Sequence, residues 1–134
     1  MSHYTKIETR LTSLPHLLKA LNDLGFNQVE SYGSPVKLEG AESFWIDETA
    51  EVVIRKEHLK ARKNDMGFKR QSDGSYVAVI SSYDEKFYDE IWIRNLSQRY
   101  SYHVTRDTLE QKGFDLIEEE QQSGEIRLTL RRMT

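Results

Sequence analysis

The sequence has no cysteine, no glycine-rich motif and no long apolar run, and each absence excludes a class of protein. Without cysteine the chain forms no disulfide, holds no iron–sulfur cluster and has no thiol nucleophile. This composition fits a reducing compartment. No stretch approaches the roughly 18 consecutive apolar residues of a membrane span, and the first residues include no signal-peptide-like run. We therefore expect a soluble, cytoplasmic protein.

Phosphate-binding loops and zinc motifs are also missing from the sequence. The glycines stand singly, at predicted helix ends or turns, and never as Gly-x-Gly-x-x-Gly or a P-loop. No serine lies in a nucleophile elbow. The histidines are dispersed without the close spacing that zinc sites use, at His3, His16, His58 and His103. We therefore predict no cofactor, no metal ligand and no catalytic residue of these classes.

The size and composition are those of one domain that spans residues 1–134. Hydrophobic residues make up 37% of the chain and charged residues 31%, which is ordinary for a globular protein. A chain of this length buries about two-thirds of the surface that its unfolded form exposes, so one core suffices. The net charge of −3 gives no overall attraction for phosphate backbones.

The most regular pattern is a leucine stripe near the N-terminus. Tyr4–Leu11 alternates as a first strand does, and Ser13 is placed to cap a following helix. The helix is indicated by apolar residues at helical spacing, namely Leu14, Leu17, Leu18, Leu21 and Leu24. Gly25 supplies the left-handed residue that ends the helix, and Phe26 can then fold back on Leu21 as in a Schellman motif.

The middle of the chain consists of short strands separated by turn residues. The predicted strands are Gln28–Tyr32, Val36–Leu38, Ser43–Ile46, Glu51–Arg55, Gly67–Gln71 and Tyr76–Ser81. The last two strands form a hairpin around Asp73-Gly74, because this dipeptide tolerates the positive φ angles of such a turn. The charged segment Glu57–Asp65 is predicted to be a loop.

A long helical pattern follows from Phe87 to Gln111. A run of this length is long for a globular helix, and Thr105 can cap a second helix, so one helix or two remain open. The inward stripe is predicted at Trp92, Leu96, Tyr100, His103 or Val104, and Thr108. The helix ends at Gly113, and a final hairpin is formed by Asp115–Gln121 and Glu125–Arg131.

This order, β-α-β(several)-α-β-β, predicts an α+β fold. We expect a mainly antiparallel sheet with two principal helices packed on one face. A Leu-x-x-x-Gly-Phe frame occurs at residues 21–26 and again at 109–114, and each copy precedes a strand that carries glutamate. Either many helices close in this way, or the chain is a pseudo-duplicated half-domain.

A basic segment runs from Arg55 to Arg70 with seven Lys or Arg against two acidic residues, a local net charge of +5. Three interpretations are open: a solvated loop, a surface for an acidic protein partner, and a nucleic-acid contact. The third ranks last because Phe68 is the one aromatic residue among these charges. The candidate partner-binding residues of this segment are Lys56, Lys60, Arg62 and Lys63.

A second candidate surface is the tyrosine-rich part of the long helix. Tyrosine and arginine dominate binding hot spots because they combine contact area with hydrogen-bonding ends. The candidates here are Arg99, Tyr100, Tyr102 and His103. Core packing competes with this interpretation, because Tyr100 and His103 fall on the inward stripe. An alternative is a pocket between sheet and helix, lined by Trp92, Tyr100 and His103.

Several segments resemble an uncharacterised family of cyanobacteria and chloroplast genomes, known as hypothetical chloroplast reading frame thirty-five. The similar segments are Met1–Thr9, Leu18–Phe26, the hairpin from Gly67-Phe68 to Tyr76, Leu96–His103, Gly113-Phe114 and Glu118–Arg132. The resemblance implies a cyanobacterial or plastid origin, or a phage of such hosts. It places the protein in the cytoplasm, the plastid stroma or the infected host cytoplasm. It implies no activity, because the family has no established functional residues.

We therefore expect a non-enzymatic interaction or accessory protein that docks an unknown protein partner, in photosynthetic or redox metabolism. The alternative is a small-ligand-binding domain or enzyme that uses the pocket between sheet and helix. Nucleic acid ranks third among the partners, as the net charge of −3 disfavours it. An exposed sheet edge also allows a homodimer.

Overall fold

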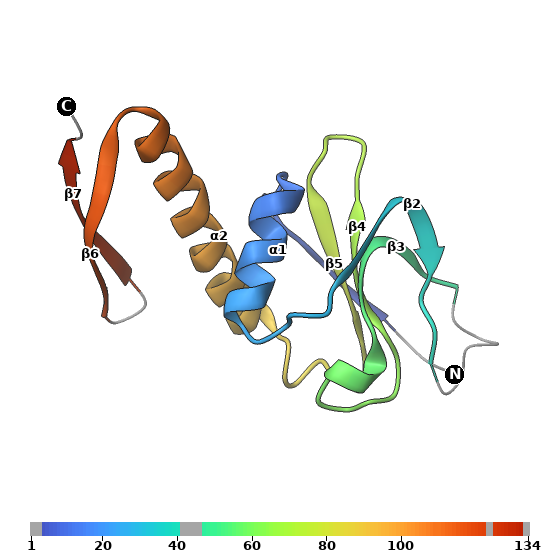
Figure 1. Cartoon of the computed structure of the whole chain (residues 1–134). Helices are drawn as coiled ribbons and strands as arrows, with labels where there is room; N and C mark the ends of the chain where they lie inside the picture. Colours follow the sequence, from blue (N-terminus) through green and yellow to red (C-terminus); the bar gives the residue numbers. More distant parts are fainter. Residues whose placement is uncertain (1–3, 41–46, 123–124, 133–134) are drawn as a thin grey trace.

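The computed structural model describes residues 4–40, 47–122 and 125–132, with the backbone alone for residues 115–122 and 125–132. Figure 1 shows helices α1 and α2 beside a sheet, with a separate hairpin at the C-terminal end. The elements are β1 (Tyr4–Glu8), α1 (Leu14–Asp23), β2 (Glu30–Lys37), β3 (Thr49–Ile54), the short 3₁₀-helix η2 (Lys56–His58), β4 (Met66–Arg70), β5 (Tyr76–Ser81), α2 (Glu90–Gln111), β6 (Phe114–Gln122) and β7 (Glu125–Arg132).

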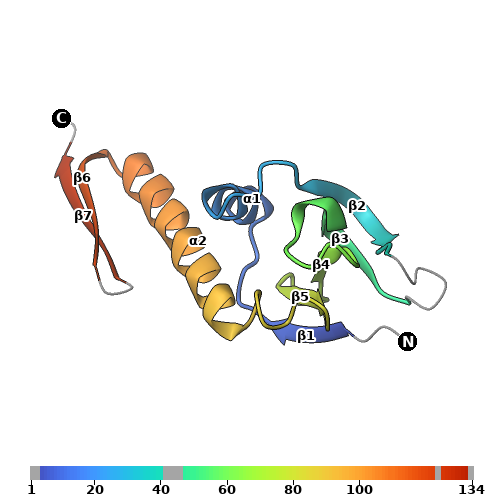
Figure 2. The ribbon, with the colours of Figure 1, turned by 90° about the horizontal axis from the view of Figure 1, so that it is seen from below.

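The main sheet has five strands in the order β1-β5-β4-β3-β2, and every neighbouring pair is antiparallel. Strands β6 and β7 pair separately as a long two-stranded hairpin. Figure 2 shows that α2 continues past the sheet and leads to this hairpin. The prediction of an α+β fold with a mainly antiparallel sheet and two helices is confirmed.

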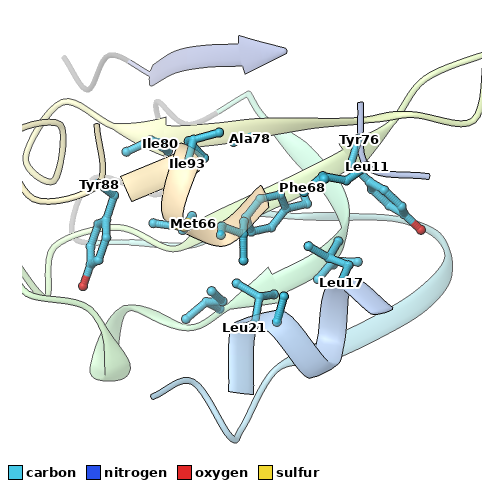
Figure 3. Close-up of a cluster of buried hydrophobic side chains, with 14 of the residues drawn as sticks. Leu11, Leu17, Leu21, Met66, Phe68, Tyr76, Ala78, Ile80, Tyr88 and Ile93 are labelled. Atoms are coloured by element: carbon cyan, nitrogen blue, oxygen red, sulfur yellow. The ribbon is translucent and has the colours of Figure 1, made fainter. Parts of the chain in front are cut away.

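Both helices contribute to the core on one face of the sheet. Leu17 and Leu21 of α1, Phe68 of β4 and Leu96 of α2 have no exposed surface and belong to one cluster. Figure 3 shows the leucines of α1 facing the aromatic ring of Phe68. Burying each such side chain contributes about 1.5–3 kcal/mol. The other face has a smaller cluster, which consists of Leu38, Ala50, Val53 and Val79.

Helix α1 ends as its sequence predicts. The N–H of Gly25 donates to the carbonyl of Asn22 (3.0 Å), and the N–H of Phe26 donates to the carbonyl of Leu21 (3.0 Å), which is the Schellman pattern. Gly25 has a φ of +99°, which a side chain would strain. The N–H of Gly113 likewise donates to Glu110 at the end of α2. The shared closure explains the repeated frame, whereas the duplicated half-domain stays a prediction.

The second helix is single and begins later than the pattern indicated. Helix α2 runs unbroken through Thr105 and starts at Glu90, after an N-cap in which Asp89 accepts the N–H of Trp92 (3.0 Å). Phe87 lies outside it because its N–H donates to the carbonyl of Asp84 (2.9 Å) in a preceding turn.

The region before β3 differs from the two short strands that the sequence predicted there. Strand β2 is continuous through Gly33 and Pro35, and its pairing register with β3 shifts between Ser31 and Val36. An edge strand tolerates proline because one side of it needs no ladder hydrogen bonds. The predicted strand Ser43–Ile46 lies outside the described residues.

Candidate functional site

The basic segment follows β3, and the buried carboxylate of Asp65 binds its first two residues. Asp65 has no exposed surface, and its Oδ1 accepts the N–H of Lys56 at 2.8 Å. Its Oδ2 accepts the N–H of Glu39 (2.8 Å) and Nη1 of Arg55 (3.0 Å). A buried carboxylate is stable only when it is paired and hydrogen-bonded in this way. The two ends of the segment, residues 55–56 and residue 65, are thereby held together.

Arg55 completes this anchor from the other side. Its Nε and Nη2 donate to the two oxygens of Glu30 at 2.8 and 2.9 Å, in a bidentate pair. Hydrogen bonds from Arg55 and Tyr32 lower the pKa of Glu30 to about 2. The Glu30 carboxylate in turn raises the pKa of Arg55 above its usual range. Arg55 therefore joins β2 to the start of the loop. Although it belongs to the basic segment, its guanidinium is already paired with Glu30 and Asp65 and does not face a partner.

A second anchor holds the middle of the segment. The N–H of Ala61 donates to Oδ1 of Asp84 (3.0 Å), and the N–H of Lys60 donates to the hydroxyl of Tyr88 (3.1 Å). Asp84 is fully buried, and burial raises its pKa although the N–H of Ala61 opposes the rise. Its Oδ2 has no hydrogen-bond partner among the described residues. The turn before α2 is thus used to position the basic loop.

The end of the segment is packed closely against Gly40. Gly40 and Asn64 form an isolated antiparallel bridge, and a Cβ added at Gly40 would lie 1.9 Å from Oδ1 of Asn64. Between the anchors, Arg62 adopts a positive φ of 56°. A residue other than glycine holds this conformation only when its surroundings determine it. The backbone of the loop is therefore held in one conformation, and its cationic side chains extend from fixed positions.

The loop is hydrogen-bonded to a turn that exposes apolar side chains. Lys60, Arg62 and Lys63 face the solvent, whereas Lys56 is half-buried and pairs with Glu57 at 3.5 Å. The neighbouring turn and the start of α2 expose Tyr83, Phe87 and Ile91, the last at 60%. The ammonium of Lys86 lies 5.1 Å from the ring centre of Phe87. We name this set the basic–aromatic surface, which consists of Lys60, Arg62, Lys63, Tyr83, Lys86, Phe87 and Ile91.

The tyrosine-rich part of α2 is arranged differently, because its charged side chains contact α1. Arg99 Nε and His103 Nε2 both lie within hydrogen-bond distance of Oδ2 of Asp23, at 2.8 and 2.7 Å. Partial burial would raise the pKa of Asp23, but the hydrogen bonds from Arg99 and His103 outweigh it and lower the pKa. Tyr102 is buried, and the Arg99 guanidinium stacks on its ring at 4.4 Å.

Tyr100 has an internal role at the start of α1. Its hydroxyl accepts the N–H groups of Thr12 (3.1 Å) and Ser13 (2.8 Å). Ser13 makes no side-chain cap of its own, since its hydroxyl lies 2.6 Å from Nδ1 of His16. The other nitrogen of His16 lies 2.6 Å from Asp107 of α2. These side chains already make contacts within the fold, which compete with binding a partner. A partner-binding role therefore stays a prediction for Arg99, Tyr100, Tyr102 and His103.

The residues of the alternative pocket make separate contacts. Trp92 packs edge-on against Tyr88 and Phe26, at 5.1 and 6.1 Å between ring centres. A cavity of about 500 Å³ does include Tyr100, but its other walls come from residues 8–11 and from Ile93, Ser97 and Ser101. The Nε2 atom of His103 lies 2.7 Å from the Asp23 carboxylate of α1. These contacts give no support to a shared pocket of Trp92, Tyr100 and His103.

Two further findings concern the described part of the chain as a whole. Over residues 4–40 and 47–114, whose side chains the structure describes, no three His, Asp or Glu side chains converge as a metal site would require. Nor does any helix there combine the length and the apolar character needed to cross a membrane.

Comparison with known proteins gives a family and no activity. The profile of a family described as "Protein of unknown function (DUF1257)" matches residues 20–129. Proteins named "Uncharacterized protein ycf35" are similar over 98% of each chain, with 28% identity in Cyanophora paradoxa and 29% in Pyropia yezoensis. No solved structure matches the chain significantly. The resemblance to the uncharacterised chloroplast reading frame is thereby confirmed.

Proposed function

The chain belongs to the DUF1257 family of proteins of unknown function, and we propose that it is a non-enzymatic docking protein that binds an acidic surface of another protein. The contact is made by the basic–aromatic surface. The predicted residues Lys60, Arg62 and Lys63 supply the positive charge. Lys56 supports the loop, since its N–H binds Asp65. Photosynthetic or redox metabolism stays the predicted setting.

One observation carries this proposal, namely the anchoring of an exposed cationic loop by buried acceptors. Asp65, Asp84 and Tyr88 bind the backbone N–H groups of the loop and leave its cationic side chains directed to solvent. Ordering a mobile loop on binding opposes affinity, at about 0.5–1.5 kcal/mol for each flexible side chain immobilised. A loop that is already ordered avoids part of this cost, so the anchors favour binding.

The exposed apolar side chains favour a protein partner over a nucleic acid. Tyrosine is enriched in protein hot spots, and the apolar side chain of Ile91 has no counterpart in phosphate recognition. Acidic residues adjoin the surface at Glu85, Asp89 and Glu90. They would repel a phosphate backbone, which is negative along its whole length, whereas an acidic protein surface can place basic side chains opposite them. A protein surface can match such a mixture of charges and apolar area.

The test compares two charge-reversed proteins with the same net charge. The first carries Lys60→Glu and Lys63→Glu on the loop. The control carries Lys37→Glu and Lys112→Glu, which are exposed positions on β2 and after α2. A partner is captured from a native lysate, purified and titrated against all three proteins. We expect the loop variant to lose roughly tenfold or more in affinity, and the control to keep the affinity of the wild type.

Two results would overturn the proposal. One is that every captured protein binds the loop variant and the control equally. The other is that the wild type shifts DNA or RNA in a salt-dependent way and the loop variant does not, which would assign the surface to nucleic acid.

A further inference from the structure

We propose that the outer edge of β1 and the acidic groove beside it bind an extended, lysine- or arginine-rich segment of a partner protein, which adds to the main sheet as a sixth strand. This site shares no residue with the basic–aromatic surface, which it adjoins at the start of α2, and it selects the opposite charge. The following observations lead to it.

Strand β1 is an edge of the main sheet. It pairs on one side with β5 from Tyr4 to Glu8, and in the described residues no strand pairs with its other side. The outer N–H and C=O groups of an edge strand are a ready template for another strand. Strand addition of this kind supplies affinity through backbone hydrogen bonds and specificity through pockets for alternate side chains.

A groove runs along this edge. It has a volume of about 450 Å³ and is lined by the consecutive residues Thr5, Lys6, Ile7 and Glu8, so it follows the strand. Its remaining lining comes from Ile80, Glu85, Tyr88, Asp89 and Glu90. Thr5 and Ile7 lie opposite Ile80 and Ala78 of β5, whose side chains belong to the core on the helix face. An added strand would thus place every second side chain between β1 and the start of α2.

The charge of the groove selects a basic segment. Its acidic lining consists of Glu85, Asp89 and Glu90 at the start of α2, whereas Lys6 and Glu8 alternate with Thr5 and Ile7 and so face the other side of the sheet. Lys6 already pairs with Glu48 at 3.4 Å. The carboxylates of Glu85 and Asp89 are held in place, because Glu85 accepts the hydroxyl of Thr5 and Asp89 caps α2. Positioned carboxylates beside an open strand edge complement lysine or arginine at alternate positions of the added strand.

The same charges disfavour a second copy of this chain at the groove. An antiparallel pairing of β1 with β1 about Lys6 would set two lysines opposite each other and bring the two sets of groove carboxylates together. Like charges directly opposite in a ladder are destabilising. The structure therefore favours a basic segment of another protein, and the homodimer predicted from the sequence becomes an outcome of the test.

The probe is a short synthetic peptide that alternates lysine and valine. Matched peptides alternate glutamate and valine, or carry N-methyl groups on the backbone of the lysine peptide. Binding is measured by fluorescence anisotropy at low salt, and hydrogen exchange reports protection of the Thr5–Glu8 amides. We expect the lysine peptide alone to bind and to protect β1. A Glu85→Lys/Glu90→Lys variant should bind it roughly tenfold more weakly or worse.

Three results would overturn the inference. The first is absence of binding by the lysine peptide. The second is equal binding by its N-methylated form, which would mean charge attraction without strand pairing. The third is a dimer in sedimentation that protects β1 without peptide. The Lys60→Glu/Lys63→Glu variant should bind the lysine peptide as the wild type does, so failure here is distinguishable from failure of the proposed function.

Discussion

Two regions of this molecule carry clustered cations, and they use these side chains in opposite ways. In the loop from Arg55 to Asp65, buried acceptors hold the backbone, so Lys60, Arg62 and Lys63 remain exposed. In α2 the backbone is already satisfied by the helix, and the side chains of Arg99, Tyr100 and His103 make the tertiary contacts.

The difference shows what makes a charged segment available to a partner. A charge that holds the fold together, such as Arg99 on Asp23, must break that contact before it binds anything else. A charge on a backbone-anchored loop has no such competition. Substitutions at the anchors should therefore change the stability of the protein, and substitutions at the exposed cations should change binding.

The largest effect is expected from Asp65→Ala at the loop anchor. The change leaves two backbone N–H groups without their acceptor, and Arg55 keeps only its pair with Glu30. A hydrogen bond to a charged group contributes about 1.5–3 kcal/mol, so losing these three should cost about 4 kcal/mol or more. Urea unfolding followed by circular dichroism measures the loss. Asp73→Ala, in the exposed hairpin turn, is the control and should cost far less. A loss under about 1 kcal/mol for Asp65→Ala would show that the loop is not anchored by this carboxylate.

A smaller loss is expected from Tyr100→Phe in α2. The substitution keeps the buried ring and removes the hydroxyl that accepts the N–H groups of Thr12 and Ser13. A hydrogen bond contributes about 0.5–1.5 kcal/mol, so losing these two should cost about 1–3 kcal/mol. Tyr102→Phe is the matched control, since its hydroxyl has a longer contact with Arg106 (3.3 Å). Equal losses in the two variants would contradict the special role of Tyr100 at the start of α1.

The fold could be predicted where local patterns agree with tertiary packing. The leucine stripe and Gly25 fixed α1 and its end, and Asp73-Gly74 fixed the hairpin turn between β4 and β5. Strand β2 could not be predicted as one piece, because Gly33 and Pro35 are turn residues by composition. Their place at a sheet edge, which depends on strand order, removes the usual penalty.

The sequence predicts the part of the candidate site that is local in the chain, and misses the part that tertiary contacts bring together. The cations Lys60, Arg62 and Lys63 are consecutive enough to be visible as a charge cluster in the sequence. Their aromatic neighbours Tyr83 and Phe87 come from the turn before α2. The hydrogen bond from the N–H of Ala61 to Asp84, 23 residues away in the sequence, joins this turn to the loop. The partner of Arg99 lies farther still, since Asp23 is 76 residues away, so periodicity alone could not show that α1 claims this side chain.

The smallest effects are expected from Glu30→Gln in the loop anchor and Asp23→Asn between the helices. Both carboxyls have lowered pKa values: hydrogen bonds from Arg55 lower that of Glu30 to about 2, and, although burial opposes the change, hydrogen bonds from Arg99 and His103 lower that of Asp23. A carboxyl with a depressed pKa stabilises the fold above its unfolded pKa, and this stabilisation is lost as the pH falls through the folded value. The window for Glu30 thus runs from 4.5 down to about 2, and that for Asp23 begins near 3.8.

Because the side chain of Glu30 is 37% exposed, water screens its pair with Arg55, and we expect each substitution to cost about 1 kcal/mol at neutral pH. The measurement is urea unfolding of wild type and variants from pH 7 to the acid limit of folding. The difference should persist to about pH 5 and then shrink, at higher pH for Glu30→Gln than for Asp23→Asn. If the difference in unfolding free energy stays constant into acid, these side chains act through packing and not through charge. The contrast between the loop and α2 would then depend on the tyrosine hydroxyls of Tyr88 and Tyr100.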